Sequence, residues 1–305
     1  MKTEKTETTN RIRTSSILLV LASGCMWGCM GLLVRPLNEI GLETMDICFL
    51  RGGVTFVIML VALLIFDRGA LKVRVKDIWC FVGTGALSVS FFNFCYFKTI
   101  TLTSLSVAAV LLYTAPAFVM IMSFFLFKEE LSKKKVVALA IAFIGCVLVS
   151  GVIAGGSTLN TKGLLVGLGA GFGYALYSIF GRYALQRGYN SLTITFYTFV
   201  FATIATVFMA DVSSIINIVE RHPEISVYTV FMILLVTLFP YLCYTKGLSG
   251  MENGTASVIA SIEPVMATVL GILVYKEKMT FTNAFGMLLV LGSIVILNNN
   301  RKRNE

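Results

Sequence analysis

Residues 244–280 read YTKGLSGMENGTASVIASIEPVMATVLGILVYKEKMT, and residues 96–132 read YFKTITLTSLSVAAVLLYTAPAFVMIMSFFLFKEELS. The two stretches align without a gap, and the most informative matches are Pro116 with Pro264 and Lys128-Glu129 with Lys276-Glu277. Chance matches are common between apolar segments, but a proline and a Lys-Glu pair that keep one register are hard to obtain by chance. We therefore interpret the chain as an internal duplication.

The composition excludes most soluble classes of protein. Of the 305 residues, 57% are hydrophobic and 13% are charged, whereas a soluble domain carries about 25% charged residues. So few charges cannot cover the outside of a soluble fold that has this much apolar surface. Disorder, a coiled coil and an ordinary soluble enzyme are excluded, and the composition indicates an all-α polytopic membrane protein.

Hydropathy divides the chain into ten candidate membrane spans. A transmembrane helix needs about 20 mostly apolar residues, and the gaps between the candidate segments are short and hold most of the charges. The first apolar run follows basic residues, as in a signal peptide, but it continues to Val34 and is too long for one, so we expect it to be retained. We expect spans at 15–34, 45–66, 78–97, 104–127, 134–153, 163–183, 192–210, 226–245, 255–275 and 282–298.

The distribution of lysine and arginine predicts the orientation. With the N-terminus in the cytoplasm, 18 of these residues fall on the cytoplasmic side and 6 on the external side, and Arg51 lies within a span. An excess of basic residues on the cytoplasmic side favours a multi-pass protein of the cell membrane with both termini in the cytoplasm. The net charge of +9 is then explained by topology, and we expect no nucleic-acid partner.

The duplication divides the ten spans into five and five. Because five is odd, the two halves enter the membrane from opposite sides, as inverted repeats related by a pseudo-twofold axis in the membrane plane. This architecture is typical of secondary transporters, which bind substrate near the midplane between the halves. We expect a cytoplasmic tail at 1–14, a five-helix repeat at 15–153, a connecting loop at 154–162, a second five-helix repeat at 163–298 and a basic cytoplasmic tail at 299–305.

With these features the sequence resembles the EamA family of the drug/metabolite transporter superfamily. The strongest local matches are Ser261-Ile262-Glu263-Pro264-Val265, Phe49-Leu50-Arg51, Tyr113-Thr114-Ala115-Pro116 and Trp27-Gly28. The resemblance covers residues 15–298, and it implies export of small metabolites such as amino acids, without ATP, through a cavity among spans one, three, four, six, eight and nine. The chain departs from symmetry at Glu263, because Ala115 holds the matching position in the first half.

Two charged residues within predicted spans are the sharpest candidates for function. A charge at the bilayer centre costs roughly 2.5–3.5 kcal/mol on insertion scales, and such a residue usually faces a cavity or a partner. Burial favours the protonated form of a carboxyl, so Glu263 is a candidate for substrate binding or proton coupling, and packing beside Pro264 is the structural alternative. Arg51 could bind an anionic substrate, pair with Glu263 or cap carbonyls of a neighbouring helix.

The remaining candidates are polar, aromatic or helix-bending residues on the predicted cavity helices. Pro116 and Pro264 lack a backbone N–H and favour a mid-helix kink, as matching hinges or as static bends. Ser257 and Ser261 share one helical face, whereas Glu263 falls off that line. Hydrogen bonding between helices is the rival interpretation for the whole set, and an interfacial aromatic belt is another for Tyr96 and Tyr244. The candidates for substrate contact are Trp27, Asn93, Tyr96, Tyr113, Tyr174, Tyr177, Tyr244, Ser257 and Ser261.

Helix ends and small residues are expected to serve structure. Ser132 and Thr280 follow the two Lys-Glu pairs and are expected to N-cap the next helix. Gly163, Gly167 and Gly171 form a small-residue face, which predicts a close contact between the repeats or between subunits.

The sequence therefore predicts a secondary transporter and no enzyme. It contains no nucleotide-binding loop of the Walker type, its single histidine is in a loop, and its seven cysteines lack the spacing of metal ligands, so we expect no catalytic residues, cofactor or metal. The expected partners are a small-molecule substrate and the lipid bilayer, in a monomer or a homodimer. Exchange of nucleotide sugars or phosphorylated sugars is the closest alternative, although only Arg51 supplies a base within the membrane. A channel or receptor is a more distant alternative.

Overall fold

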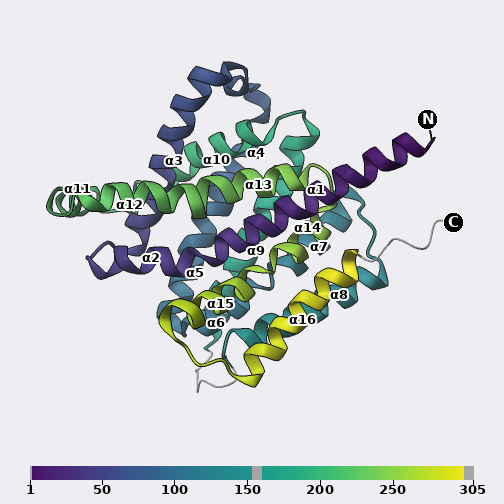
Figure 1. Ribbon diagram of the computed structural model, residues 1–305. Helices are drawn as coiled ribbons and strands as arrows, with labels where there is room; N and C mark the ends of the chain where they lie inside the picture. Colours follow the sequence, from purple (N-terminus) through teal and green to yellow (C-terminus); the bar gives the residue numbers. More distant parts are fainter. Residues whose placement is uncertain (1, 153–159, 299–305) are drawn as a thin grey trace.

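The computed structural model describes residues 2–152 and 160–298, with side chains from residue 13 onward, and all regular structure in these ranges is helical. Figure 1 shows α8 and α16 packed side by side along one edge, and α11 projecting at one end of the molecule. The first half contains α1 (Lys2–Gly28), α2 (Met30–Glu39), α3 (Thr44–Phe66), α4 (Ile78–Val82), α5 (Phe91–Leu102), α6 (Leu105–Leu112), α7 (Ala115–Phe127) and α8 (Lys133–Val149). The second half contains α9 (Thr161–Gln186), α10 (Ser191–Thr206), α11 (Val212–Arg221), α12 (Glu224–Ile233), α13 (Phe239–Leu248), α14 (Asn253–Ala260), α15 (Glu263–Tyr275) and α16 (Phe281–Asn298).

The fold is that of a helical membrane protein. Within the described ranges, eight helical stretches are long and apolar enough to cross a membrane: Arg13–Glu39, Thr44–Phe66, Val75–Leu102, Leu105–Phe127, Thr161–Gln186, Glu224–Leu248, Asn253–Tyr275 and Phe281–Asn298. The other two predicted spans, 134–153 and 192–210, coincide with α8 of 17 residues and α10 of 16 residues. These helices are shorter than the eight, and the ten-span arrangement stays a prediction.

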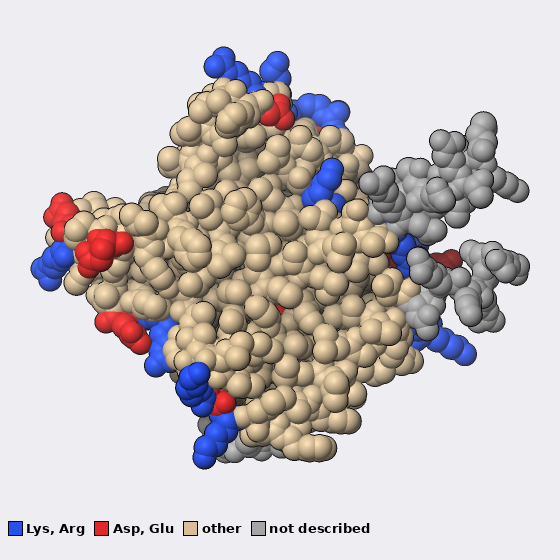
Figure 2. Space-filling model, in the orientation of Figure 1, with Lys and Arg blue, Asp and Glu red and all other residues tan. Residues whose placement is uncertain are grey.

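The surface has the polarity that a bilayer requires. On the face shown in Figure 2, charged side chains gather along the margins, and the wide surface between them carries almost none. Large apolar side chains such as Leu165, Leu288 and Val295 are exposed on the outer helices. In water this surface would be an aggregation hazard, whereas lipid solvates it.

Two helices are interrupted near their middle, at positions that match in the duplicated register. The chain breaks at Tyr113–Thr114, between α6 and α7, and again at Ser261–Ile262, between α14 and α15. The prediction of prolines that kink a continuous helix is wrong in detail, because Pro116 and Pro264 lie in the first turn of the helix that follows the break. A first-turn N–H has no intrahelical acceptor, so proline starts a helix there at no cost in hydrogen bonds.

The chain also contains a second pair of irregular segments, which the sequence did not predict. Residues Gly83–Ser90 and Leu234–Leu238 form π-helical turns, and in the duplicated register 234–238 aligns with 86–90. Short π segments inside helices frequently lie at functional sites. Hydropathy does not reveal them, since they change the winding of a helix and leave its apolar character intact.

Each helix break is covered by a glycine from the other half of the chain. A Cβ on Gly171 of α9 would lie 2.4 Å from Thr114 Oγ1 and 2.8 Å from the Leu111 carbonyl oxygen. A Cβ on Gly24 of α1 would lie 2.5 Å from Ile262 Cγ2. The predicted glycine face on α9 is therefore a contact between the halves.

The helix ends that follow the Lys-Glu pairs are also matched. Ser132 Oγ accepts a hydrogen bond from Lys135 N at 3.3 Å, and Thr280 Oγ1 accepts one from Asn283 N at 3.1 Å. Both predicted N-caps are confirmed. Lys128 and Lys276 end α7 and α15 with left-handed φ values of 58° and 57°, so the two halves reverse direction in the same way.

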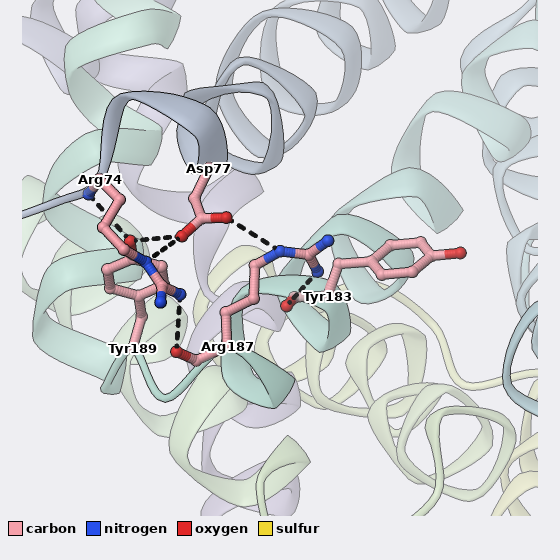
Figure 3. A network of polar contacts seen from close by, with 5 residues as sticks. All are labelled: Arg74, Asp77, Tyr183, Arg187 and Tyr189. Carbon is pink, nitrogen blue, oxygen red and sulfur yellow. Dashed lines mark hydrogen bonds and ion pairs between the residues drawn. The ribbon is translucent and has the colours of Figure 1, made fainter.

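A polar network braces the two halves at one end of the bundle (Figure 3). The Asp77 carboxylate, which is 3% exposed, accepts hydrogen bonds from Arg74 Nε at 2.7 Å, Arg187 Nε at 3.1 Å and the Tyr189 hydroxyl at 2.8 Å. The contacts with Tyr189 and Asp77 raise the pKa of Arg74 above its ordinary value. Because one buried carboxylate satisfies both guanidinium groups, the network stabilises the connections near residues 74 and 187.

The connection between the predicted seventh and eighth spans, which the predicted orientation places outside, contains a helix that hydropathy did not indicate. Helix α11 packs Ile215 against Leu37 and Met232, and Asp46 Oδ1 accepts a hydrogen bond from Asp211 N at 2.8 Å just before this helix. The segment is too short and too polar to resemble a membrane span, so a hydropathy profile does not detect it.

Gly171→Ala tests the contact between α9 and the first helix break. The new methyl group must displace a hydroxyl and a backbone carbonyl, so we expect a loss of about 1–3 kcal/mol of stability. Gly292→Ala is the matched control, because no described atom beyond the adjacent backbone of its own helix lies within 4 Å of its Cβ position, and alanine favours a helix over glycine by about 1 kcal/mol. Thermal unfolding in detergent should show a lower Tm for Gly171→Ala only. An unchanged Tm would mean that this contact is loose.

Candidate functional site

A small cavity lies where the two helix breaks face α9. Its volume is about 20 Å³, which is room for roughly one water molecule. Five of the predicted site residues line it, together with Pro116: Tyr113, Tyr174, Ser257, Ser261 and Glu263. Elements from both halves of the chain therefore form the walls.

Glu263 is the first residue of α15 and, among the described residues, the only acidic one that lines the cavity. The first amides of a helix have no intrahelical acceptor, and the helix dipole is positive at that end, so both favour a carboxylate there. Tyr174 of α9 lines the same cavity as the Glu263 carboxyl. Among the described residues, no ion pair includes Glu263, so the carboxyl is available to a cationic ligand or a proton.

An aromatic cluster adjoins the cavity through Tyr174. The Trp27 ring centroid lies 6.1 Å from that of Tyr174, 5.3 Å from that of Tyr241 and 5.5 Å from that of Tyr244. Trp27 is 6% exposed and is held from α1 against α9 and α13. Edge-to-face aromatic pairs of this kind fix ring orientations, so the wall beside the carboxyl is rigid and apolar.

Two of the predicted contact residues make hydrogen bonds between helices. The Tyr177 hydroxyl pairs with Thr245 Oγ1 at 2.7 Å, and Ser178 Oγ pairs with the Tyr244 hydroxyl at 2.7 Å. Tyr244 is only 3% exposed, so its placement in an interfacial belt is wrong. These bonds fasten α9 to α13 behind the aromatic cluster, and neither Tyr177 nor Tyr244 lines the cavity.

Three further candidates are not among the residues that line the cavity. Arg51 Nε donates to Thr237 Oγ1 at 2.8 Å, which ties α3 to the second π segment, and among the described residues Arg51 forms no ion pair with Glu263. Asn93 donates to the Val89 carbonyl at 2.6 Å on its own helix. Tyr96 packs on Phe92 and Phe97.

The break between α14 and α15 changes which residues share a face. On one continuous helix Glu263 would lie off the line of Ser257 and Ser261, but the turn at Ser261–Ile262 brings all three to the cavity. Leu112 and Ala260 end α6 and α14 at the two breaks, and they line the cavity as well, although the sequence did not single them out. In the described part of the chain, no group of three or more His, Cys, Asp or Glu side chains is placed to hold a metal ion.

Comparison with known proteins gives one consistent result. Residues 14–151 and again 161–299 match the model of the EamA-like transporter family. A protein of Clostridium kluyveri named as an uncharacterized transporter is 26% identical over 275 residues, which cover 86% of this chain and 85% of that protein. The Bacillus subtilis uncharacterized transporter YetK is 24% identical, over 81% of this chain and 77% of its own. A solved crystal structure matches 93% of this chain and 96% of its own chain with a TM-score of 0.75 at 16% sequence identity, so the two proteins share the fold.

Thr237→Val tests whether Arg51 is held in place by its hydroxyl partner. The substitution preserves shape but leaves a guanidinium N–H without its acceptor, so we expect a loss of about 1–3 kcal/mol. Thr55→Val is the matched control, since Thr55 is equally buried and its hydroxyl has no hydrogen-bond partner. Thermal unfolding should separate the two variants. If both lower the Tm alike, the Arg51–Thr237 bond is not a stabilising contact.

Proposed function

The chain belongs to the EamA-like transporter family, and from that membership we propose that it is a secondary active transporter that exports a small amphipathic solute carrying an amine, such as an amino acid or a related metabolite. The observation that carries the proposal is the carboxyl of Glu263 at the broken end of α15, which forms no ion pair with any described residue. It lies in a cavity that both halves of the chain form.

The chemistry of the cavity supports an amine-bearing substrate. A carboxylate attracts an ammonium group, and the Ser257 and Ser261 hydroxyls and the Tyr113 hydroxyl offer polar contacts on the same walls. The faces of Trp27 and Tyr174 can stabilise a cation that sits over them. A cavity of about 20 Å³ holds no metabolite, so substrate entry requires the helices on either side of the breaks to move apart.

The two-part match to the family supports our proposal for the architecture. Ten spans arranged as inverted five-helix repeats, 15–153 and 163–298, would enclose the cavity between them and place both termini in the cytoplasm of the cell membrane. Two halves of like structure can exchange conformations, so states open to either side have similar energies. Alternating access with Pro116 and Pro264 beside the moving joints follows from this arrangement.

The chemistry of the cavity disfavours the closest alternative. A nucleotide sugar or phosphorylated sugar needs several basic groups at its phosphates. Among the described residues, no lysine or arginine lines the cavity, and Arg51 is engaged with Thr237. An amine therefore fits better than a phosphate.

Reconstitution in liposomes with a panel of metabolites, with and without a pH gradient, tests the function. We expect an acidic lumen to drive accumulation of an amine-bearing solute, because protons that leave through Glu263 are exchanged for substrate. If no solute moves under any gradient, the assignment as a transporter loses its support.

Glu263→Gln tests the coupling. Glutamine keeps the size of the side chain and cannot titrate, so accumulation should fall to the level measured without a pH gradient. Exchange of solute across the membrane should persist only with a weaker apparent affinity, because the neutral amide attracts the ammonium group less than the carboxylate does. Glu220→Gln, on exposed α11, is the control with the same change of charge and should behave as the wild type. Proton-driven accumulation that persists in Glu263→Gln would remove Glu263 from the mechanism.

A further inference from the structure

The start of α14 is held by side chains from other helices. Glu129 accepts hydrogen bonds from the N–H groups of Asn253 at 2.8 Å and Gly254 at 3.2 Å. These are the first two residues of α14, whose amides have no acceptor within the helix. Arg182 Nε donates to Asn253 Oδ1 at 2.8 Å, and Arg182 Nη2 donates to the Met251 carbonyl. A carboxylate from the first half and a guanidinium from α9 thus close on one helix end.

Two further contacts strengthen this connection. Lys135 Nζ lies 2.6 Å from Glu252 Oε2, and Asn253 Nδ2 donates to Ser123 Oγ at 3.0 Å. Glu129 and Lys135 flank the connection between α7 and α8, so this whole corner of the first half is fixed to the start of α14. In the predicted orientation this corner lies at the cytoplasmic end of the molecule.

The duplicated register gives each member of this contact a counterpart at the opposite end. Glu277 corresponds to Glu129, Leu105 corresponds to Asn253, and Arg35 corresponds to Arg182 with the register shifted by one residue. None of these counterparts is engaged in the same way. Glu277 is exposed and, in the part of the chain that the structure describes, its carboxylate forms no side-chain hydrogen bond or ion pair. Arg35 pairs with Glu39 at 3.1 Å, and both side chains are more than half exposed.

The start of α6 is free to accept such a contact. Ser104 Oγ accepts only from Val107 N, at 3.2 Å, which leaves the N–H groups of Leu105 and Ser106 without an intrahelical acceptor. Leu105 is 62% exposed. These two amides occupy the positions that Asn253 and Gly254 occupy on α14.

Glu277 already has the backbone geometry of its counterpart. The N–H groups of Glu129 and Glu277 donate to the carbonyls of Ser123 and Gly271, each at 3.3 Å. The two glutamates therefore follow α7 and α15 on turns of the same shape. They differ in the carboxylate, because that of Glu277 rests against Gly271 on its own helix, where a Cβ would lie 2.5 Å from Oε2.

We infer that Glu129 and Glu277 are alternate latches of the transport cycle: Glu129 caps α14 while the cytoplasmic end is closed, and Glu277 caps α6 while the external end is closed. This inference rests on the proposed alternating access of two inverted repeats. Each latch is a carboxylate on helix N–H groups, a charge-assisted contact that forms only when the two halves meet at that end. The two latches exclude each other, since closing one end separates the halves at the other.

Hydrogen exchange of the protein in lipid nanodiscs, followed by mass spectrometry, tests the latches without any substrate. In Glu129→Gln the uncharged amide is a weaker acceptor, so we expect the amides at 253–256 to exchange about tenfold faster. The amides at 105–107 should exchange more slowly, because the population shifts toward the state in which Glu277 caps them. Glu130→Gln removes the same charge from the adjacent, exposed residue and should change neither segment.

The double variant Glu129→Gln with Glu277→Gln isolates the second latch. It should keep the fast exchange at 253–256 and lose the slowing at 105–107. A merely local role for Glu129 would leave 105–107 unchanged in the single variant, and that result would overturn the inference. If Glu129→Gln fails to fold, Glu129→Asp, which keeps the charge and shortens the reach, should shift both segments in the same directions by less, and the absence of these shifts would equally overturn it.

The hydrogen-exchange experiment and the transport experiment can contradict their hypotheses independently of each other. If Glu129→Gln speeds hydrogen exchange at 253–256 and slows it at 105–107 in a protein that moves no solute, the result would support the latches and count against the proposed function. Proton-driven transport without these opposite changes in hydrogen exchange would support the function and count against the latches.

Discussion

A bilayer offers no water to backbone N–H and C=O groups, so a helix can be interrupted within it only where other protein atoms cover the break. Besides a one-residue break at Cys29, the described chain has a matched pair of interrupted helices, after Leu112 and after Ala260. At the first break Thr114 Oγ1 donates to the Leu111 carbonyl at 2.6 Å, and at the second Ser261 Oγ donates to the Ser257 carbonyl at 3.3 Å. Side chains thus satisfy carbonyls that the broken helices release.

The remaining cover comes from the opposite half of the chain. Gly171 lets α9 lie directly on the break in the first half, and Gly24 lets α1 lie on the break in the second half. Neither half could keep its interrupted helix alone, because the atoms that shield it belong to the other. The candidate site follows from this mutual shielding of the two helix breaks. The broken end of α15 presents Glu263 at a helix N-terminus, and α9 supplies Tyr174 beside it. Because both halves contribute walls to the cavity, any movement of one half relative to the other also moves the cavity walls.

Features that depend on short local motifs could be predicted from the sequence, whereas features that depend on contacts between the two halves could not. The family, the helical membrane class, the matched helix ends at Ser132 and Thr280, and the importance of Tyr113, Tyr174, Ser257, Ser261 and Glu263 to one cavity all depend on short motifs or their register. The role of Pro116 and Pro264 as first-turn residues was missed because a hydropathy pattern does not show where a long apolar segment divides. The engagement of Arg51 with Thr237, and of Tyr177 with Thr245, depends on how α3, α9 and α13 pack. Residue type alone leaves binding and packing equally open for such side chains.

The departure from symmetry at Ala115 has a physical reason under the proposed function. Ala115 and Glu263 line the same cavity of about 20 Å³, and two carboxyls confined so closely could not both ionise, because like charges disfavour each other's ionised form. One would stay protonated and would be lost to both binding and coupling. A single carboxyl on the boundary between the halves remains in the cavity whichever end is closed, so the same group meets the substrate and the proton in turn. Under the proposed alternating access, the duplicated scaffold would supply two equivalent conformations, and the single glutamate would give them one shared site.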